Sequence, residues 1–298
     1  MEYKTREKTF AFSKNIRDDC KHCLSFNTLA KRTFGLSFEE WHKAGFWTDK
    51  YQPYALLDGG KVVSNVSVNI IDTIWKSSPK RYIQLGTVMT APECRNMGLS
   101  KFLMNRIFDD WLSYCNAVYL YANDSVLNFY PKFGFVKAEE YQATMQAKAR
   151  NAPVKNLDMA NKSDIETLQK FYQKSNPFSE LPMTDNWELL MFYCSSFMKN
   201  SIYFVADADA VVIAEQDKDI LTVFDVYCEN TVTLTDVISA IVNVHSARTQ
   251  VRLGFAPKSA TNSDLSLLHE ENTTLFVFEG KENIFKNNKT MFPLLSHA

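Results

Sequence analysis

The stretch TVMTAPECRNMGLSKFLMNRIF, residues 87–108, joins an apolar run to an amphipathic helix through a short loop. The apolar run ends at Ala91-Pro92, and one glycine, Gly98, stands directly before the helical pattern. From there apolar residues recur every four positions and so share one helical face: Leu99, Leu103, Ile107 and Trp111. The sequence therefore predicts a strand over residues 81–90, a tight loop, and a helix that begins at the loop.

This loop is suited to an anion. The first amides of a helix have no backbone partner, so they point at whatever the loop holds. Gly98 lets a ligand approach the backbone closely, and successive amides of such a turn form a concave nest whose field adds to the helix dipole. Arg95 and Lys101 add positive charge, which makes pyrophosphate a fitting ligand. The loop matches neither the dinucleotide fingerprint nor the P-loop, so by itself it also fits an ordinary turn.

Composition bounds the class of protein. A chain of 298 residues, 46% of them hydrophobic, can fill two cores of about 100–150 residues each. Its 33 Lys and Arg residues nearly balance 34 Asp and Glu, which gives no general reason to expect nucleic acid or a membrane as partner. The charged N-terminus has no apolar signal core, and no run of about 18 uncharged apolar residues occurs, so we expect a soluble, cytoplasmic protein.

The cysteines do not indicate a metal site. We expect them to be reduced, because a protein of this size needs no disulfide bonds. Cys20 and Cys23 alone have the spacing of metal ligands, but a structural zinc site needs four ligands and no second pair of matching spacing occurs. Two small thiols on one face of a helix explain the pair, so no metal is expected.

The order of predicted elements repeats along the chain. The first half is expected to contain helices over 15–33 and from residue 37, a hairpin over 52–75, the strand and helix of the opening stretch, a strand over 117–122, a short helix over 124–130 and final strands over 134–145. A polar linker is expected over 148–156, and the second half repeats the outline of the first. Its expected elements are helices over 162–174 and 186–199, a hairpin over 201–216, a strand over 220–228, a helix over 234–246, a strand over 251–257, a helix over 264–269 and a strand over 273–280. We therefore expect an α/β fold of two tandem domains, 1–148 and 154–298, each a mixed central sheet flanked by helices.

Two sequence blocks resemble the GNAT acetyltransferase superfamily. Residues 95–100, RNMGLS, resemble its Arg/Gln-x-x-Gly-x-Gly/Ala loop, and the preceding VMTAPECR is similar to its strand and Pro-Glu turn. Residues 122–135, ANDSVLNFYPKFGF, resemble its asparagine and tyrosine segment, in which Asn123 and Tyr130 stand seven apart. Both blocks occur in the family's order, and the second half resembles the degenerate copy of a tandem-GNAT subset.

The resemblance implies acetyl-CoA as cosubstrate. Amides of residues 96–101 would hold its pyrophosphate, residues 88–90 would pair with its pantetheine arm like an added strand, and Asn123 would border that arm. The implied cofactor-binding residues are Val88, Met89, Thr90, Arg95, Asn96, Met97, Gly98, Leu99, Ser100, Lys101 and Asn123. An amide near Val88 or Met89 would stabilise the tetrahedral oxyanion.

Tyr130 is the implied general acid for the departing thiolate. A tyrosine with a pKa near 10 is protonated at neutral pH, and a thiolate with a pKa near 8.5 gains by accepting its hydrogen bond. Pro131 directly after it departs from the family pattern and would rotate the phenol. The alternative role for Tyr130 is an aromatic anchor at the end of a helix.

No general base is evident, because the predicted central strand, YIQLGTVMT, has no carboxylate. Glu39, Glu40 and Asp49 lie in an aromatic segment, residues 38–54, which would either line an acceptor pocket or pack the first helices on the sheet. The C-terminal carboxylate of Ala298 is another candidate, since its apolar tail favours burial, and water is a further one.

These features predict an N-acetyltransferase that moves an acetyl group from acetyl-CoA to a primary amine, on a small molecule or a lysine side chain, by direct attack. The alternative is a GNAT-fold module that binds CoA or acyl-CoA without catalysis. In the second half the corresponding loop, CENTVTLTDV, has no glycine and an added acidic residue, so it is not expected to bind CoA. That half would shape the acceptor side of the first domain or support a homodimer.

Overall fold

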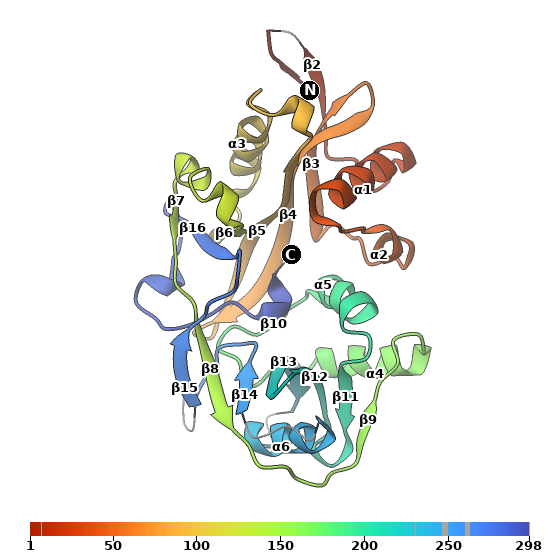
Figure 1. The fold of residues 1–298 in the computed structure, drawn as a ribbon, viewed down its shortest axis with the longest axis vertical. Helices are drawn as coiled ribbons and strands as arrows, with labels where there is room; N and C mark the ends of the chain where they lie inside the picture. Colours follow the sequence, from red (N-terminus) through yellow and green to blue (C-terminus); the bar gives the residue numbers. More distant parts are fainter. Residues whose placement is uncertain (7, 230, 246–249, 260–262, 298) are drawn as a thin grey trace.

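The computed structural model describes residues 1–6, 8–229, 231–245, 250–259 and 263–297. Two β-sheets lie at opposite ends of its long axis, with helices around them (Figure 1). Every helix in this described part of the chain is too short or too polar to span a lipid bilayer.

The first sheet has nine strands. Eight follow in the order β1-β2-β3-β4-β5-β6-β16-β7, and β10 pairs with β4 beside this series. The strands span Glu2–Lys4 (β1), Thr9–Ser13 (β2), Tyr51–Asp58 (β3), Lys61–Trp75 (β4), Ser78–Thr90 (β5), Ala117–Ala122 (β6), Phe135–Lys137 (β7), Met183–Thr184 (β10) and Thr274–Phe278 (β16). Neighbouring strands are antiparallel except β5 and β6, which are parallel.

The second sheet has seven strands in the order β15-β8-β14-β13-β12-β11-β9. They span Tyr141–Gln146 (β8), Val154–Asn156 (β9), Ile202–Val205 (β11), Ala210–Asp217 (β12), Ile220–Cys228 (β13), Gln250–Leu253 (β14) and Ser263–Leu267 (β15). Here β13 and β14 form the parallel pair. The expected fold class, mixed α/β with two central mixed sheets flanked by helices, is confirmed.

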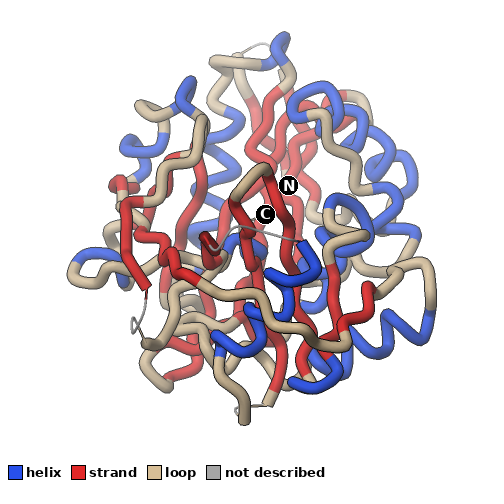
Figure 2. The backbone as a smooth tube through the Cα atoms, turned by 60° about the horizontal axis from the view of Figure 1, so that its bottom comes forward, coloured by secondary structure: helices blue, strands red, loops and turns tan. Residues whose placement is uncertain are grey.

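The helices are Cys20–Phe34 (α1), Glu39–Lys43 (α2), Leu99–Trp111 (α3), Lys162–Tyr172 (α4), Trp187–Phe192 (α5) and Leu234–His245 (α6). Figure 1 shows α1 and α2 on one side of β4 and α3 on the other, and Figure 2 shows helices in blue flanking the strands in red. α1 is defined at both ends: Asp19 accepts from the amides of Lys21 and His22, and Gly35 takes the left-handed conformation that ends a helix. Cys23 is buried on this helix while Cys20 is exposed, so only one of the two thiols faces the core.

The two sheets exchange a strand. β8 pairs with β14 and β15 in the second sheet, and β16, from the end of the chain, inserts between β6 and β7 of the first. The expectation that each strand completes the sheet of its own half is therefore wrong. In β16, Leu275, Phe276 and Val277 are all buried, so the strand is apolar on both faces and suits a central position. The division into domains 1–148 and 154–298 stays a prediction, and neither segment alone would contain a whole sheet.

The exchange joins the halves through a shared core. Tyr119 of β6 stacks on Phe292 with ring centroids 4.0 Å apart, and Leu181 and Ile284 pack in the same buried cluster as Ile71 of β4. Residues of the second half thus cover one face of the first sheet, and β10 extends that sheet where β3 has ended.

Three local predictions differ from the structure. The expected helix over 264–269 is wrong, because β15 occupies this segment and pairs with the otherwise open edge of β8. The hairpin of β1 and β2 was not predicted, although Thr9–Ser13 alternates polar and apolar residues. The expected linker over 148–156 ends in β9, which pairs with β11.

Replacing Phe276 with alanine should lower the free energy of unfolding by about 3–5 kcal/mol, because the ring is fully buried in an exchanged strand. Urea denaturation followed by far-UV circular dichroism and by tryptophan fluorescence should give coincident single transitions, since the sheets share strands. Leu265→Ala in β15 is the control, because Leu265 is 40% exposed and its removal should change stability by no more than about 0.5 kcal/mol. Two separate transitions would contradict this coupling of the halves.

Candidate active site

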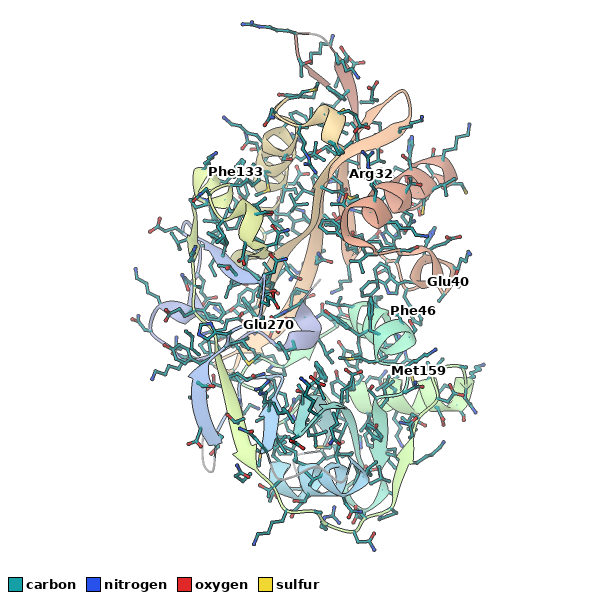
Figure 3. The ribbon with its side chains drawn as sticks, in the orientation of Figure 1. Arg32, Glu40, Phe46, Phe133, Met159 and Glu270 are labelled. Carbon is teal, nitrogen blue, oxygen red and sulfur yellow. The ribbon has the colours of Figure 1, made fainter. Side chains whose placement is uncertain are left out.

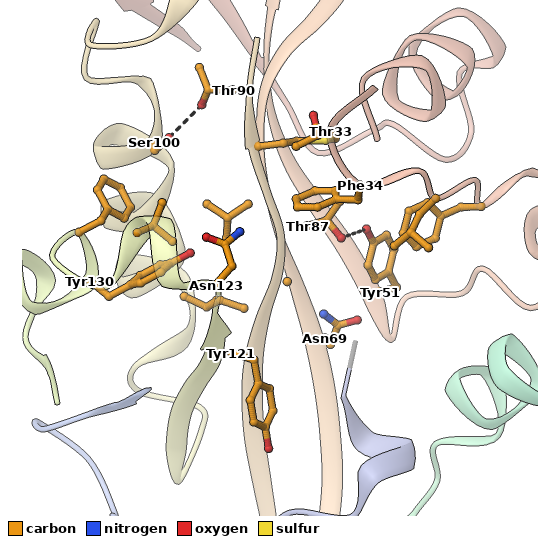
Figure 4. Close-up of a pocket in the computed structure, with 18 of the residues that line it drawn as sticks. Thr33, Phe34, Tyr51, Asn69, Thr87, Thr90, Ser100, Tyr121, Asn123 and Tyr130 are labelled. Carbon is orange, nitrogen blue, oxygen red and sulfur yellow. Dashed lines mark hydrogen bonds between the residues drawn. The ribbon is translucent and has the colours of Figure 1, made fainter. Parts of the chain in front are cut away.

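β5 and β6 separate inside the first sheet. The parallel strands pair from Tyr82 and Ala117 to Leu85 and Leu120, after which β5 continues to Thr90 beside β4. A pocket of about 1080 Å³ opens where the two strands part (Figure 4). Its walls come from α1, α2, β5, the loop before α3, the segment after β6 and α5, so both halves of the chain contribute.

A strained residue bends β5 at this pocket. Thr87 has a φ of 47°, which a β-branched residue rarely adopts, and the register of β4 and β5 shifts between Asn65 and Ser67 opposite it. The hydroxyls of Tyr51 and Thr87 lie 2.8 Å apart (Figure 4), and the Asn65 amide donates to the Thr87 carbonyl at 2.9 Å. Ser67 donates to the Tyr51 oxygen at 2.9 Å. These buried side chains hold the strained conformation in place.

The loop before α3 has the geometry expected of an anion site. Asn96 and Gly98 have left-handed φ values of 62° and 77°, and no side chain caps the helix. Among the described residues, none accepts a hydrogen bond from the amides of residues 96–101. These amides are therefore free to bind an anion, next to the side chains of Arg95 and Lys101 that line the same pocket.

The hairpin of β1 and β2 holds this loop from outside. The Tyr3 hydroxyl donates to the Met97 carbonyl at 3.0 Å, and the Tyr3 ring lies 4.9 Å from the ring of Phe102 in α3. A Cβ atom added to Gly98 would lie 2.7 Å from the Tyr3 oxygen. Glycine is thus required at position 98 by its positive φ and by Tyr3.

The structure brings most of the predicted site residues together. The pocket is lined by Val88, Met89, Thr90, Arg95, Asn96, Gly98, Leu99, Ser100, Lys101, Asn123 and Tyr130. Met97 is not among the lining residues, and its carbonyl is engaged by Tyr3. Ser100, which stands where the family has glycine or alanine, lies 3.0 Å from the Thr90 hydroxyl.

Tyr130 follows β6 across the pocket from β5. Instead of the expected helix over 124–130 there are two 3₁₀ turns, Asp124–Val126 and Tyr130–Phe133, so Tyr130 begins a turn rather than ending one. Pro131 falls in the first positions of the second turn, where its missing N–H leaves no hydrogen bond unmade. The phenol oxygen of Tyr130 points into the pocket towards Asn123 (Figure 4). Burial raises the pKa of Tyr130 to about 12, so the group is protonated at neutral pH.

The carboxylates considered as bases do not reach this pocket. Glu39 and Glu40 pair with Lys43 at 2.9 and 3.1 Å, and Asp49 pairs with Arg17 at 2.9 Å. Figure 3 shows Glu40 on the outer side of α2. None of these carboxylates lines the pocket, because their helix and loop turn aromatic side chains inward. Ala298 lies outside the described residues.

The other end of the pocket has aromatic walls and a tyrosine floor. Phe38, Trp41 and Tyr51 both line it and pack on one another, so the two roles weighed for this segment coexist. Tyr121 also lines it, with its hydroxyl directed away from Tyr130 (Figure 4) and donating to Glu140 at 3.1 Å.

A buried carboxyl and a histidine lie behind Tyr121. Burial raises the pKa of Glu140, which also accepts from the Phe292 amide, to about 8. His297 lies with its ring centroid 3.9 Å from that of Tyr121, and burial lowers its pKa to about 3. His297 is therefore neutral at physiological pH.

Sequence reasoning missed Tyr3, Asn65, Ser67 and the pocket residues of α5. Asn65 and Ser67 had a signal: with Asn69 they alternate with Val66 and Val68, so polar residues recur at every second position of this strand. The contribution of α5 had none, since it depends on how the halves pack.

Comparison with known proteins agrees with this geometry. Residues 16–135 match the model of the acetyltransferase (GNAT) family. A probable N-acyltransferase from Enterococcus faecalis V583, a conserved protein of unknown function, superposes with a TM-score of 0.60 at 13% identity, over 91% of this chain and 73% of that one. Eis1 from Mycobacterium abscessus superposes with a TM-score of 0.56 at 13% identity, over 89% of this chain and 73% of that one.

A GCN5-related N-acetyltransferase from Anabaena variabilis ATCC 29413 gives a TM-score of 0.55 at 14% identity, over 90% of this chain and 72% of that one. A comparison with curated proteins finds no match. The structural likenesses extend over both halves and show the fold, while the family match falls on the segment that carries the loop, the separated strands and Tyr130. Residues 16–135 are therefore similar to the GNAT acetyltransferase family, and the chain as a whole shares the fold of these solved structures.

Proposed function

We propose that this protein is a cytoplasmic N-acetyltransferase that transfers the acetyl group of acetyl-CoA to a primary amine by direct attack. One observation supports this proposal most. The free amides at the start of α3 and the buried, protonated Tyr130 lie in the same pocket, on opposite sides of the separated strands. The proposed roles are pyrophosphate binding by residues 96–101 with Arg95 and Lys101, pantetheine pairing by residues 88–90 beside Asn123, and protonation of the thiolate by Tyr130. The proposed unit 1–148 would carry out catalysis. The proposed unit 154–298 would close one side of its pocket.

Direct attack is favoured over an acyl-enzyme. Cys94 is the cysteine that lines the pocket, and it lies at the loop where the phosphates would sit. Burial raises the pKa of its thiol, which keeps it protonated and a poor nucleophile.

In the described part of the second half, the start of α6 differs from the start of α3. The amide of Asp236 at the start of α6 donates to the Thr233 hydroxyl at 3.1 Å, and that hydroxyl donates to the Asp236 carboxylate at 2.7 Å. The helix terminus is thus capped by the chain's own side chains and carries a negative charge, whereas the terminus of α3 is uncapped. This contrast supports a single CoA site.

A non-catalytic module that only binds CoA or acyl-CoA is the second candidate. The observation that favours it is the position of Glu39, Glu40 and Asp49 in ion pairs outside the pocket, which removes these three carboxylates as bases. Turnover of acetyl-CoA with any amine would exclude this candidate.

Acetyl-CoA should bind to the wild-type protein in a calorimetric titration, and Ser100→Glu should weaken binding by at least about 100-fold. The added carboxylate would lie at the helix terminus beside the phosphates, where like charges about 4 Å apart cost about 4 kcal/mol at an effective dielectric constant of about 20. Ser100→Gln is the matched control, because it adds the same bulk without charge. Glutamate in a first helical turn favours folding, so loss of binding would not reflect unfolding. Equal affinities for the two variants, or no binding by the wild type, would exclude the anion site.

Tyr130→Phe should lower kcat by about 10²–10⁴-fold while acetyl-CoA affinity is retained, because only proton donation to the thiolate is lost. A phenol with its pKa raised by burial stays protonated as the pH rises, so wild-type kcat should not fall through this group between pH 7 and pH 10. Tyr114→Phe, at a tyrosine 72% exposed, is the control and should match the wild type. A Tyr130→Phe enzyme with wild-type kcat would remove Tyr130 from the mechanism.

Tyr3→Phe should raise KM for acetyl-CoA by about 3- to 10-fold, the usual worth of one hydrogen bond, and leave KM for the amine unchanged. The reason is that Tyr3 orients the Met97 carbonyl in the loop and does not itself line the pocket. Steady-state kinetics with each substrate varied in turn would measure both constants. Equal increases in the two KM values would indicate a general structural effect instead.

A further inference from the structure

The end of the pocket away from the phosphate loop, here called the acceptor chamber, is built from aromatic rings. Phe38 stacks on Tyr51 with ring centroids 5.4 Å apart and on Phe192 at 5.5 Å. The Phe192 ring also meets the edge of Trp41 at 5.6 Å. All four side chains line the pocket, and Phe192 comes from α5 of the second half. The chamber is therefore closed by one half against the other.

The charges near the chamber are turned away or neutralised. The carboxylates of α2 lie in exposed ion pairs with Lys43, and Figure 3 shows Glu40 on the outer side of this helix. Lys50 does line the pocket, but its ammonium pairs with Asp72 at 2.6 Å and with Asp185 at 2.7 Å. Arg81 pairs with Asp72 as well, at 2.8 Å, so this group of charges is balanced.

One carboxylate remains among the described lining residues, that of Glu188. Its backbone carbonyl accepts from the Trp41 indole at 2.8 Å, which fixes the residue at the chamber wall. Glu188 and Tyr172 also border a smaller neighbouring pocket. The chamber thus offers several aromatic faces and at most one negative charge.

We propose that the acceptor is a primary amine with a single positive charge on a flat apolar body about the size of an aromatic ring, and that polycationic amines are poor acceptors. This inference rests on the proposed N-acetyltransferase function. Aromatic faces stabilise one ammonium group and bury an apolar body. Each additional charge would lose its hydration in a chamber that has no second free carboxylate. The acidic residues Glu39, Glu40 and Asp49 of the aromatic segment are engaged in ion pairs outside the pocket, so they offer no negative charge to a polycation.

The first test is binding, which does not require turnover. Phenethylamine and spermidine are titrated calorimetrically into the protein saturated with CoA. Phenethylamine should bind at least about 10-fold more tightly, because burying its ring contributes more than an additional contact of the flexible polyamine. Tighter binding of spermidine would overturn the inference, as would equal binding.

The second test identifies the wall. Phe192→Ala should weaken phenethylamine binding by about 10-fold and leave spermidine binding within about twofold, since the lost ring would pack on the apolar body while Phe38, Trp41 and Tyr51 remain for the ammonium group. Phe192→Leu keeps most of the side-chain volume and is the control for a folding defect. It should bind phenethylamine with an affinity between those of the wild type and Phe192→Ala. Glu40→Gln is the control for charge, because Glu40 faces solvent, and should bind both amines as the wild type does. Unchanged phenethylamine binding in Phe192→Ala would overturn the assignment of this wall.

Measuring acetylation of both amines distinguishes failure of the acceptor proposal from failure of the proposed N-acetyltransferase function. With acetyl-CoA present, the wild type should acetylate phenethylamine with a kcat/KM at least about 10-fold above that for spermidine. If phenethylamine binds preferentially but no amine is acetylated, the enzyme function fails and the assignment of the chamber stands. If spermidine is the better substrate, the function stands and the inference fails.

Discussion

The opening between β5 and β6 depends on a few buried hydrogen bonds around Thr87. A parallel pair of strands that continued to its ends would use the edge of residues 88–90 for its own ladder, and no pocket would form. Instead the ladder stops after Leu85, and the left-handed Thr87 is held by Tyr51 and Asn65. The strain of one residue is thus offset by a polar network inside an apolar sheet. Both the loop before α3, which follows β5, and Tyr130, which follows β6, take their positions from this separation.

The second half completes what the first half leaves open. β16 lies beside β6, and its Phe276 ring is 5.8 Å from the ring of Tyr130, so a strand from the end of the chain supports the proposed general acid. On the other side of β5, α5 brings Phe192 against the aromatic segment of the first half. The second half thus supplies one strand to the first sheet and one wall to the pocket.

Much of this arrangement follows from local sequence patterns. Gly98 before a run of apolar residues at helical spacing identified the loop and α3, and paired glycines identified the turn between β3 and β4. These features depend on neighbours in the chain. The strand exchange does not, since the sequence of β16 predicts a buried strand but not which sheet it enters. Local sequence also does not predict the hydrogen bond from Tyr3 to Met97, because these residues are far apart in the chain. Nor does it predict that the acidic residues of α2 point outward, because that direction depends on how the helix packs.

The exchange of β8 and β16 has a consequence for synthesis. β6 and β7 leave the ribosome long before β16, which lies between them and follows the whole of the second sheet in the chain. At about 5–20 residues per second, the gap between β6 and β7 stays open for on the order of ten seconds. During that time two strand edges and the ring of Tyr130 have no permanent cover, and exposed edges invite pairing with other chains. The nascent protein is thus vulnerable to aggregation until β16 arrives, and the packing of Phe276 near Tyr130 forms only then.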